Sequence, residues 1–209
     1  MNGLFITLEG GEGSGKTTIA KNVVNKMSLA GVDVIYTREP GGNKIAEEIR
    51  SIILNPENTE MDSRTEALLY AAARRQHLVE KIYPALEAGD IVICDRFIDS
   101  SLVYQGHARG IGIEEVLKIN KFAIDECMPQ LTIFLDIEPE VGLERISANK
   151  GREINRLDLE EITFHEMVYK GYQNQVEQNP QRIKVVDASQ SIEKVSQEVY
   201  ELIMNELSK

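Results

Sequence analysis

Residues 10–17 read GGEGSGKT, which matches the phosphate-binding loop pattern G-x-x-x-x-G-K-[ST] at every required position. The apolar run at 4–8 predicts a buried strand that leads into this loop, and the residues from Thr17 onward predict a helix after it. In such a unit the glycines let successive backbone N–H groups converge on an anion, and the helix dipole adds to the attraction. The alternative is a glycine-rich turn in an ordinary strand–helix unit.

Two residue types in the loop carry specific chemistry in this prediction. The ammonium group of Lys16 reaches the outer phosphates, and the hydroxyl of Thr17 is a ligand for Mg²⁺. Asp95 follows another apolar run and is expected to hold Mg²⁺ beside Thr17, although an aspartate there is also common as a turn or cap residue. Arg96 follows directly and is expected to point into the crevice at the carboxyl ends of the strands.

The composition is that of an ordinary globular protein. The chain has 209 residues, 42% of them hydrophobic and 27% charged, which suits one domain spanning residues 1–209. A net charge of −11 argues against general nucleic-acid binding. The apolar runs are too short to span a membrane and no secretory leader precedes Leu4, so we expect a cytoplasmic location. Cys94 and Cys127 show neither metal-site nor disulfide spacing, and Cys94 is expected in the core.

Strand and helix patterns alternate along the chain. Five apolar runs predict strands, at 4–8, 32–36, 91–94, 131–135 and 182–186. These runs are almost continuously apolar, as in a parallel sheet covered on both faces, so the fold class is α/β. Helices are expected at 45–53, at 114–126, and from a capping box at Ser63 and Glu66 to about Tyr83, just before Pro84; a loop and a short helix are expected after Asp95, through Gln105.

Aromatic and arginine side chains at helical spacing suggest a base-binding site. Tyr70 and Arg74 lie four residues apart, so the ring could stack on a base while the guanidinium bonds its edge. If residues 97–105 are helical, Ser101, Tyr104 and Gln105 share a face, which we place opposite that pair. The alternative is a Tyr–Arg pair on a solvated helix.

A polar segment at 149–158, with the sequence NKGREINRLD, lies between two helical patterns. A surface loop is the default interpretation of such a segment. In a phosphoryl-transfer enzyme it would be a lid that closes its arginines onto developing charge and excludes water. Arg156 could instead pair with Asp158 or Glu160 as a structural anchor.

Five segments together resemble the bacterial thymidylate kinase family, and closely its staphylococcal members: EGGEGSGKTT at 9–18, TREPGG at 37–42, EALLYAAARRQH at 66–77, DRFIDSSLVYQG at 95–106 and GREINRLD at 151–158. The resemblance covers essentially the whole chain. It implies a P-loop nucleoside-monophosphate kinase fold: a five-stranded parallel sheet, helices on both faces and a short lid at about 149–158. It also implies Mg²⁺-dependent transfer of the γ-phosphoryl group of ATP to dTMP, giving dTDP and ADP, usually by a homodimer.

Site residues follow from the same resemblance. It implies catalytic roles for Lys16, Arg96, Arg152 and Glu12. The ATP-binding residues would be Gly10, Gly11, Gly13, Ser14, Gly15, Lys16, Thr17, Thr18, Arg152 and Arg156. The dTMP-binding residues would be Glu12, Glu39, Arg50, Tyr70, Arg74, Arg96, Ser101, Tyr104 and Gln105, and the metal ligands Thr17 and Asp95. Residues 11–14 contain no arginine, which resembles the subgroup whose lid supplies it.

The roles in the acceptor site are implied residue by residue. Glu12 would lie near the dTMP sugar, and Arg96 would clamp the dTMP phosphate. Tyr70 stands where the family more often has a phenylalanine as the stacking ring. Arg74, Ser101 and Gln105 match contacts to the base edge, Tyr104 matches the ring beneath the deoxyribose, and Glu39 and Arg50 match residues that line the site.

Three hypotheses therefore stand at the level of sequence: a dTMP kinase, a kinase for another nucleoside or nucleoside monophosphate, and an ATP-binding switch without an acceptor. The Asn/Thr-Lys-x-Asp signature of guanine recognition is absent from the sequence, so a GTP switch is not favoured. The dependence of ADP release on a panel of acceptors separates the three.

Overall fold

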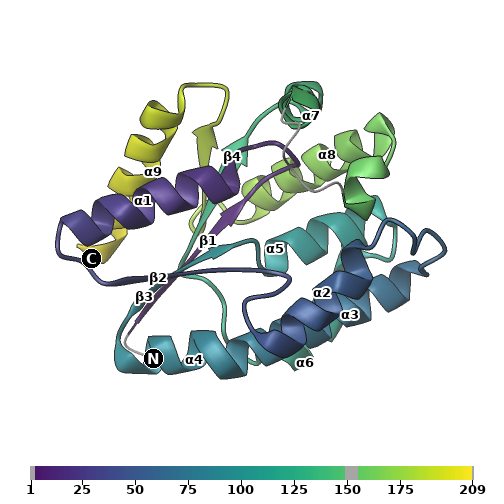
Figure 1. Ribbon diagram of the computed structural model, residues 1–209, viewed down its shortest axis with the longest axis horizontal. Helices are drawn as coiled ribbons and strands as arrows, with labels where there is room; N and C mark the ends of the chain where they lie inside the picture. The colour runs from purple at the N-terminus through teal and green to yellow at the C-terminus, as the bar shows by residue number, and fades with distance from the viewer. Residues whose placement is uncertain (1–2, 149–154, 209) are drawn as a thin grey trace.

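The computed structural model describes residues 3–148 and 155–208, and its centre is a parallel sheet of five strands (Figure 1). Their order across the sheet is β2-β3-β1-β4-β5. The strands are β1 (Leu4–Glu9), β2 (Val34–Arg38), β3 (Ile91–Asp95), β4 (Leu131–Asp136) and β5 (Ile183–Asp187). The predicted five-stranded parallel sheet is confirmed, and each strand extends one or two residues past its predicted carboxyl end.

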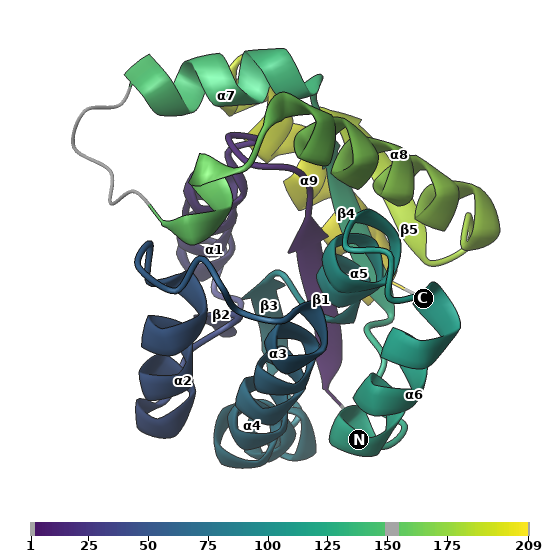
Figure 2. The same ribbon diagram turned by 90° about the vertical axis from the view of Figure 1, so that its right-hand side faces the viewer.

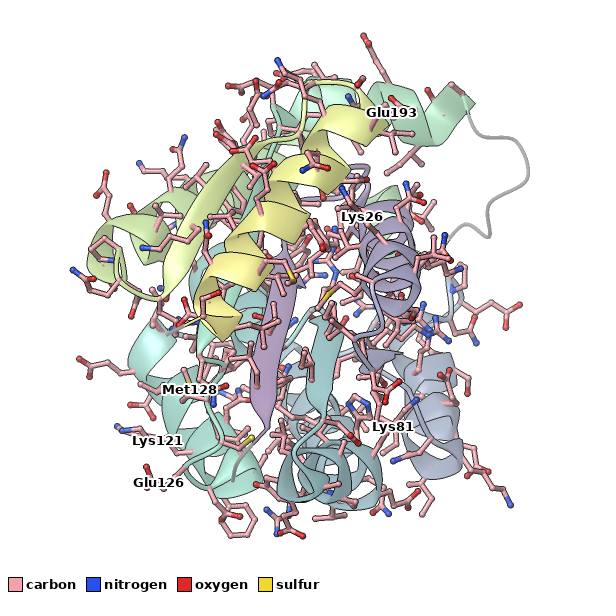
Figure 3. The ribbon with its side chains drawn as sticks, turned by 90° about the vertical axis from the view of Figure 1, so that its left-hand side faces the viewer. Lys26, Lys81, Lys121, Glu126, Met128 and Glu193 are labelled. Atoms are coloured by element: carbon pink, nitrogen blue, oxygen red, sulfur yellow. The ribbon has the colours of Figure 1, made fainter. Side chains whose placement is uncertain are left out.

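Helices cover both faces of the sheet (Figure 2). On one face lie α1 (Lys16–Leu29) and α9 (Ile192–Leu207), which pack against each other; the Lys26 ammonium lies 4.4 Å from the centre of the Tyr200 ring (Figure 3). On the other face lie α3 (Ser63–His77), α6 (Ile113–Ile124) and α8 (Ile162–Gln178). No helix in residues 3–148 and 155–208 is both long and apolar enough to cross a membrane.

The central strand β1 explains how the two faces differ. Side chains alternate along a strand, so Ile6 and Leu8 pack under α1 and α9 while Phe5, Thr7 and Glu9 face the opposite layer. The row of Phe5, Thr7 and Glu9 becomes more polar toward the carboxyl end of the strand, where the loop at 10–15 begins. Buried polar groups therefore collect directly beneath the loop.

Two helical segments differ from the prediction because π-helical turns continue them. After α3, residues Leu78–Ile82 form a π-helical turn (η1), and α4 (Tyr83–Ala88) follows with Pro84 in its first turn. The predicted end before Pro84 is wrong, because a proline is tolerated where the backbone N–H has no helical partner. Likewise, α5 (Ile98–Ser101) continues as a π-helix, η2 (Leu102–Ala108).

The start of α3 is capped by Asp62, so the predicted capping box at Ser63 is wrong. The Asp62 carboxylate accepts hydrogen bonds from Arg64 N at 3.0 Å and Thr65 N at 3.1 Å. Ser63 is already the first helical residue, and Glu66 turns inward, where it is 1% exposed. A carboxylate in the first turn of a helix can pair with buried cations instead of capping its own helix, and Glu66 does so.

The remaining elements shape the rim of the site. They are α2 (Lys44–Leu54), α7 (Pro139–Ala148) and a short 3₁₀ helix, η3 (Arg156–Leu159). In η3 the side chain of Asn155 accepts from Leu157 N and Asp158 N, and Asp158 reaches back to Asn155 N at 2.9 Å. This capping box follows the segment at 149–154, which lies outside the described residues.

Candidate active site

The loop after β1 wraps around its own lysine. Lys16 Nζ donates to Gly10 O at 3.1 Å, Gly11 O at 2.8 Å and Ser14 Oγ at 3.1 Å. Glycine is required at Gly13, which has a φ of +73° and where a Cβ would lie 2.0 Å from the carbonyl oxygen of Gly142 in α7. The loop thus presents a buried cation at the N-terminus of α1, the geometry that binds phosphate.

Burial changes the acidity of this lysine. Lys16 is 7% exposed, and desolvation, with a contribution from Arg96, lowers its pKa to about 8. Glu12, Asp95 and Glu9 oppose that shift. The pKa of Lys16 is therefore close enough to neutral pH for a bound anion to change the protonation of its ammonium group.

Thr17 and Asp95 lie together, as the sequence predicts. Leu8 of β1 is in register with Asp95 at the end of β3, and Thr17 Oγ1 donates to Asp95 Oδ2 at 2.5 Å. No group of three or more His, Cys, Asp or Glu side chains in the described parts of the chain could hold a metal ion by itself. A hydroxyl and one carboxylate beside a phosphate-binding loop nevertheless fit Mg²⁺, which takes few protein ligands and completes its shell with phosphate and water.

Arg96 has an unusual backbone. Its φ is +71°, in the left-handed region, which costs a non-glycine residue about 1–3 kcal/mol. From there the side chain crosses to the loop, where Nη2 donates to Glu12 Oε1 at 2.6 Å and Nη1 donates to Gly10 O at 3.0 Å. Arg96 thus joins the corner after β3 to the phosphate-binding loop.

A cavity of about 770 Å³ runs past these groups. One end is lined by the loop, by Arg145 of α7 and by Gln190 and Ser191 before α9; the other end is lined by Arg38, Glu39, Pro40, Arg50, Leu54 and Tyr70. Asp95, Arg96 and Glu12 line the part between. The cavity therefore has two ends joined at the phosphate-binding centre, and the expected residues Glu39, Arg50 and Tyr70 all lie at the second end.

Arg74 is held behind that second end. It is 1% exposed, with Nε donating to Glu39 Oε2 at 2.7 Å and Nη1 donating to Ser101 Oγ at 3.0 Å and to Asn120. Nη2 donates to Phe97 O at 2.9 Å. Four of its five donors are used in these contacts, so one Nη2 hydrogen is left without a partner among the described residues. The expected meeting of Arg74 and Ser101 occurs, but the guanidinium also supports the structure.

The other expected base-contacting residues are buried too. Tyr104 and Gln105 are 3% and 1% exposed, and neither is among the described residues that line the cavity. The Tyr104 hydroxyl donates to Glu12 Oε1 at 3.2 Å, and Gln105 Nε2 donates to Glu66 Oε1 at 2.8 Å. Their contacts with a bound base stay predictions.

Arg156 is an anchor in this structure. Its guanidinium donates to Ile53 O at 2.9 Å and pairs with the buried carboxylate of Glu66. The expected pairing with Asp158 or Glu160 is not the one found, because Glu160 pairs with Arg109 at 2.5 Å. A contact of Arg156 with ATP stays a prediction, and Arg152 lies outside the described residues.

Sequence reasoning missed several residues that the fold brings to the site. Arg145 and Gln190 line the cavity, and Arg145 Nη1 donates to Ala188 O at 3.0 Å. Glu9 and Tyr172 lie beneath the loop, with the Tyr172 hydroxyl 2.9 Å from Glu9 Oε2. Glu9 carried a usable signal, an acidic residue ending an apolar run, whereas Tyr172 is 163 residues away from it and carried none.

These features define a class of protein. A parallel sheet, a phosphate-binding loop with its lysine, a Thr–Asp pair and a two-ended cavity together make a P-loop kinase that acts on a nucleoside monophosphate.

Comparisons with known proteins give the family. Residues 8–199 match the family model described as thymidylate kinase. A thymidylate kinase of Oceanobacillus iheyensis is 62% identical over 208 residues, which cover 100% of this chain and 92% of the relative. One from Bacillus pumilus is 57% identical over 209 residues, covering 100% and 99%. The crystal structure of thymidylate kinase from Ehrlichia chaffeensis superposes with a TM-score of 0.77 at 32% identity, over 98% of this chain and 99% of that one. The chain belongs to the thymidylate kinase family.

Proposed function

We propose that the chain transfers the γ-phosphoryl group of ATP to dTMP, giving dTDP and ADP. The observation that carries the proposal is the cavity whose two ends meet at Lys16, Asp95 and Arg96. ATP would occupy the end beside α7 and α9, with its phosphates on the loop, and dTMP the end lined by Glu39, Arg50 and Tyr70. The acceptor phosphate would then approach the γ-phosphate in line, between two cations.

The residues act mainly by position and charge. Phosphoryl transfer needs little covalent chemistry from the protein, so fixed cations around the moving group supply most of the rate enhancement. Lys16 would neutralise charge on the outer phosphates of ATP, and Arg96 would hold the dTMP phosphate. Glu12 holds Arg96 by a 2.6 Å ion pair, and Arg152 would add the lid arginine that the loop lacks.

Mg²⁺ would be held by Thr17 and Asp95 together with the ATP phosphates. When bound, the ion neutralises charge on the β- and γ-phosphate oxygens. The protein's own contribution is to keep Thr17, in the first turn of α1, beside Asp95 at the carboxyl end of β3, where the 2.5 Å hydrogen bond joins them.

Acceptor selectivity tests the proposal. Thymine has a carbonyl oxygen at its 4-position and cytosine an amino group, so a side chain with donors only, such as Arg74, favours thymine. A buried donor left unpaired costs about 1–3 kcal/mol, or roughly 5- to 150-fold in kcat/KM. ADP release should require an acceptor and fall in the order dTMP, dUMP, then dCMP and UMP. ADP release without an acceptor, or a preference for dCMP, would refute the assignment.

We also propose that the protein is a homodimer in the cytoplasm. Support for the dimer comes from Phe122 on α6 and Leu68 on the adjacent α3, which are 89% and 56% exposed. Lys121, near the C-terminal end of α6, and Glu126 and Met128, just after it, lie at the surface in Figure 3, so a second copy of the chain can reach this end of α6.

Sedimentation equilibrium tests the dimer. Phe122→Glu should yield a monomer, because a charge would be buried against the partner. Leu29→Glu is the matched control, since Leu29 is 82% exposed on α1, and it should leave the mass unchanged. A wild-type monomer at micromolar concentration would contradict the proposal. The cytoplasmic location is supported by the two free thiols, Cys94 and Cys127, and by the nucleotide substrates.

A further inference from the structure

Glu9 is a buried carboxylate directly before the loop, and the mechanism above leaves it without a role. It is 0% exposed. Its Oε1 accepts hydrogen bonds from Phe97 N at 2.8 Å and Ser100 N at 3.3 Å. Its Oε2 accepts from Ser100 Oγ at 2.6 Å and from the Tyr172 hydroxyl at 2.9 Å. One side chain of β1 thus gathers the corner after β3 and a residue of α8.

The backbone of Arg96 is clamped on both sides by β1. Arg96 N donates to Leu8 O at 2.9 Å, and the next amide, Phe97 N, donates to Glu9 Oε1. The first bond continues the pattern of the sheet, but the second is made by a side chain. The φ of +71° at Arg96 is one that side chains rarely adopt, so it needs such constraints to persist.

Two hydroxyl groups bridge Glu9 to the guanidinium of Arg96. Ser100 Oγ and the Tyr172 hydroxyl lie 3.1 Å and 3.3 Å from Arg96 Nη1. A hydroxyl has one hydrogen, and a hydrogen bond to a carboxylate is stronger than one to a neutral group. When both hydroxyls donate to Glu9 Oε2, their lone pairs are left for Arg96. The two hydroxyls also lie 2.9 Å from each other, and the charge of the carboxylate favours the arrangement in which both hydrogens point to Oε2 over the one in which one hydroxyl donates to the other.

We propose that Glu9 is a positioning residue that holds Arg96 in its left-handed conformation and aims the guanidinium at the acceptor phosphate. The inference rests on the proposed function of Arg96 as the clamp on that phosphate. Glu9 acts through Arg96, Ser100 and Tyr172 and does not touch the substrate. Its removal should weaken binding of the phosphate group and leave binding of the nucleoside part unchanged.

The ionisation of Glu9 supports this role. Burial, and next the charge of Asp99, raise the pKa of Glu9 to about 7, while the bonds from Ser100 and Phe97 N and the charge of Arg96 hold it down. Lys16, Tyr172, Cys94 and Arg182 are the other titratable or charged groups that interact with it. Because only the ionised form can accept both hydroxyl hydrogens at Oε2, the affinity for dTMP should fall below about pH 7.

The test compares dTMP with thymidine, which lacks the phosphate, by calorimetric titration of the full-length protein. Glu9→Gln keeps an acceptor for Phe97 N but loses the charge, and Glu9→Met keeps the size and loses every acceptor. We expect dTMP affinity to fall about 10-fold in the first variant and about 100-fold in the second, as for loss of hydrogen bonds to a charged group. Thymidine affinity should stay within about two-fold, because thymidine lacks the phosphate group that Arg96 is proposed to hold.

Further variants separate positioning from general damage. Tyr172→Phe removes one bridging hydroxyl, keeps the ring that stacks on Phe134 at 5.0 Å, and should lower dTMP affinity selectively. Ser196→Ala is the control: it removes a buried hydroxyl of α9, on the opposite face of the sheet, whose partner is Asn22, and it should change the affinity for neither ligand. From pH 8 to pH 6, wild type should lose more dTMP affinity than Glu9→Gln, since titration of the phosphate itself is common to both.

Equal losses of dTMP and thymidine affinity, or no loss of either in both Glu9 variants, would overturn the inference. Failure of the proposed function looks different. In that case the wild-type protein would show no dTMP-dependent ADP release, or would bind dTMP no better than thymidine.

Discussion

Binding of ATP should drive a proton onto Lys16. In the free protein burial lowers the pKa of this lysine to about 8, so at pH 8 about half of the molecules carry the neutral amine. The phosphates of ATP are opposite charges at contact distance, which raise such a pKa by roughly two units. The expected uptake on binding is then about 0.1 proton at pH 7, about 0.5 at pH 8 and about 0.8 at pH 9.

Isothermal titration calorimetry measures this uptake. Titrations of ATP in excess Mg²⁺ are made in two buffers with different ionisation enthalpies, and the difference in apparent heat gives the number of protons. The phosphate groups of ATP are already deprotonated at these pH values, so they do not contribute. Lys16→Met is the matched control, because it keeps the length of the side chain and removes the amine.

The reasoning fails if uptake does not increase from pH 7 to pH 9, or if Lys16→Met takes up as many protons as wild type. The first outcome would mean that the ammonium stays charged in the loop, held by Gly10 O, Gly11 O and Ser14 Oγ. The second would place the titrating group elsewhere.

Three further predictions concern stability and the anchor of the lid. In the folded protein the pKa of Glu9 is about 7, against an ordinary value of 4.5, so the contribution of Glu9 to stability is lost as the pH rises between those values. The free energy of unfolding of Glu9→Gln, measured by urea denaturation, should therefore exceed that of the wild type by about 3 kcal/mol at pH 8 and equal it near pH 4. Arg74→Ala leaves buried Glu39 without its 2.7 Å partner and should cost about 3–5 kcal/mol, whereas a loss under about 1 kcal/mol would make Arg74 a ligand contact only. Arg156→Ala removes the closer of the two arginines that pair with buried Glu66, leaves Arg109 at 3.4 Å, and should cost about 1–3 kcal/mol; unchanged stability with a large loss of kcat would instead assign Arg156 to ATP.

The sequence by itself determined the elements of this protein and the chemistry at their ends. Hydrophobic periodicity and glycine spacing are local properties, so the five strands and the loop at 10–17, with Lys16 and Thr17 at the start of the helix after it, could be inferred without coordinates. The pairing of Thr17 with Asp95 was also accessible, because the carboxyl ends of parallel strands meet at one edge. Helix boundaries were less accessible, as Pro84 shows: a proline breaks a helix in its interior but is tolerated in the first turn, and the local sequence does not say which of the two positions it takes.

Only the tertiary structure decided what the buried charges do. The local sequence predicts a capping role for Glu66 and a lid role for Arg156, but in the folded chain the two form an ion pair across 90 positions of the sequence. Arg74 reads as a base contact, and packing has also made it the partner of Glu39. A buried charge must be paired, and its partner is set by which elements the fold brings together, not by local spacing. For the same reason the sequence shows Glu9 before the loop but not the Arg96 backbone that it holds.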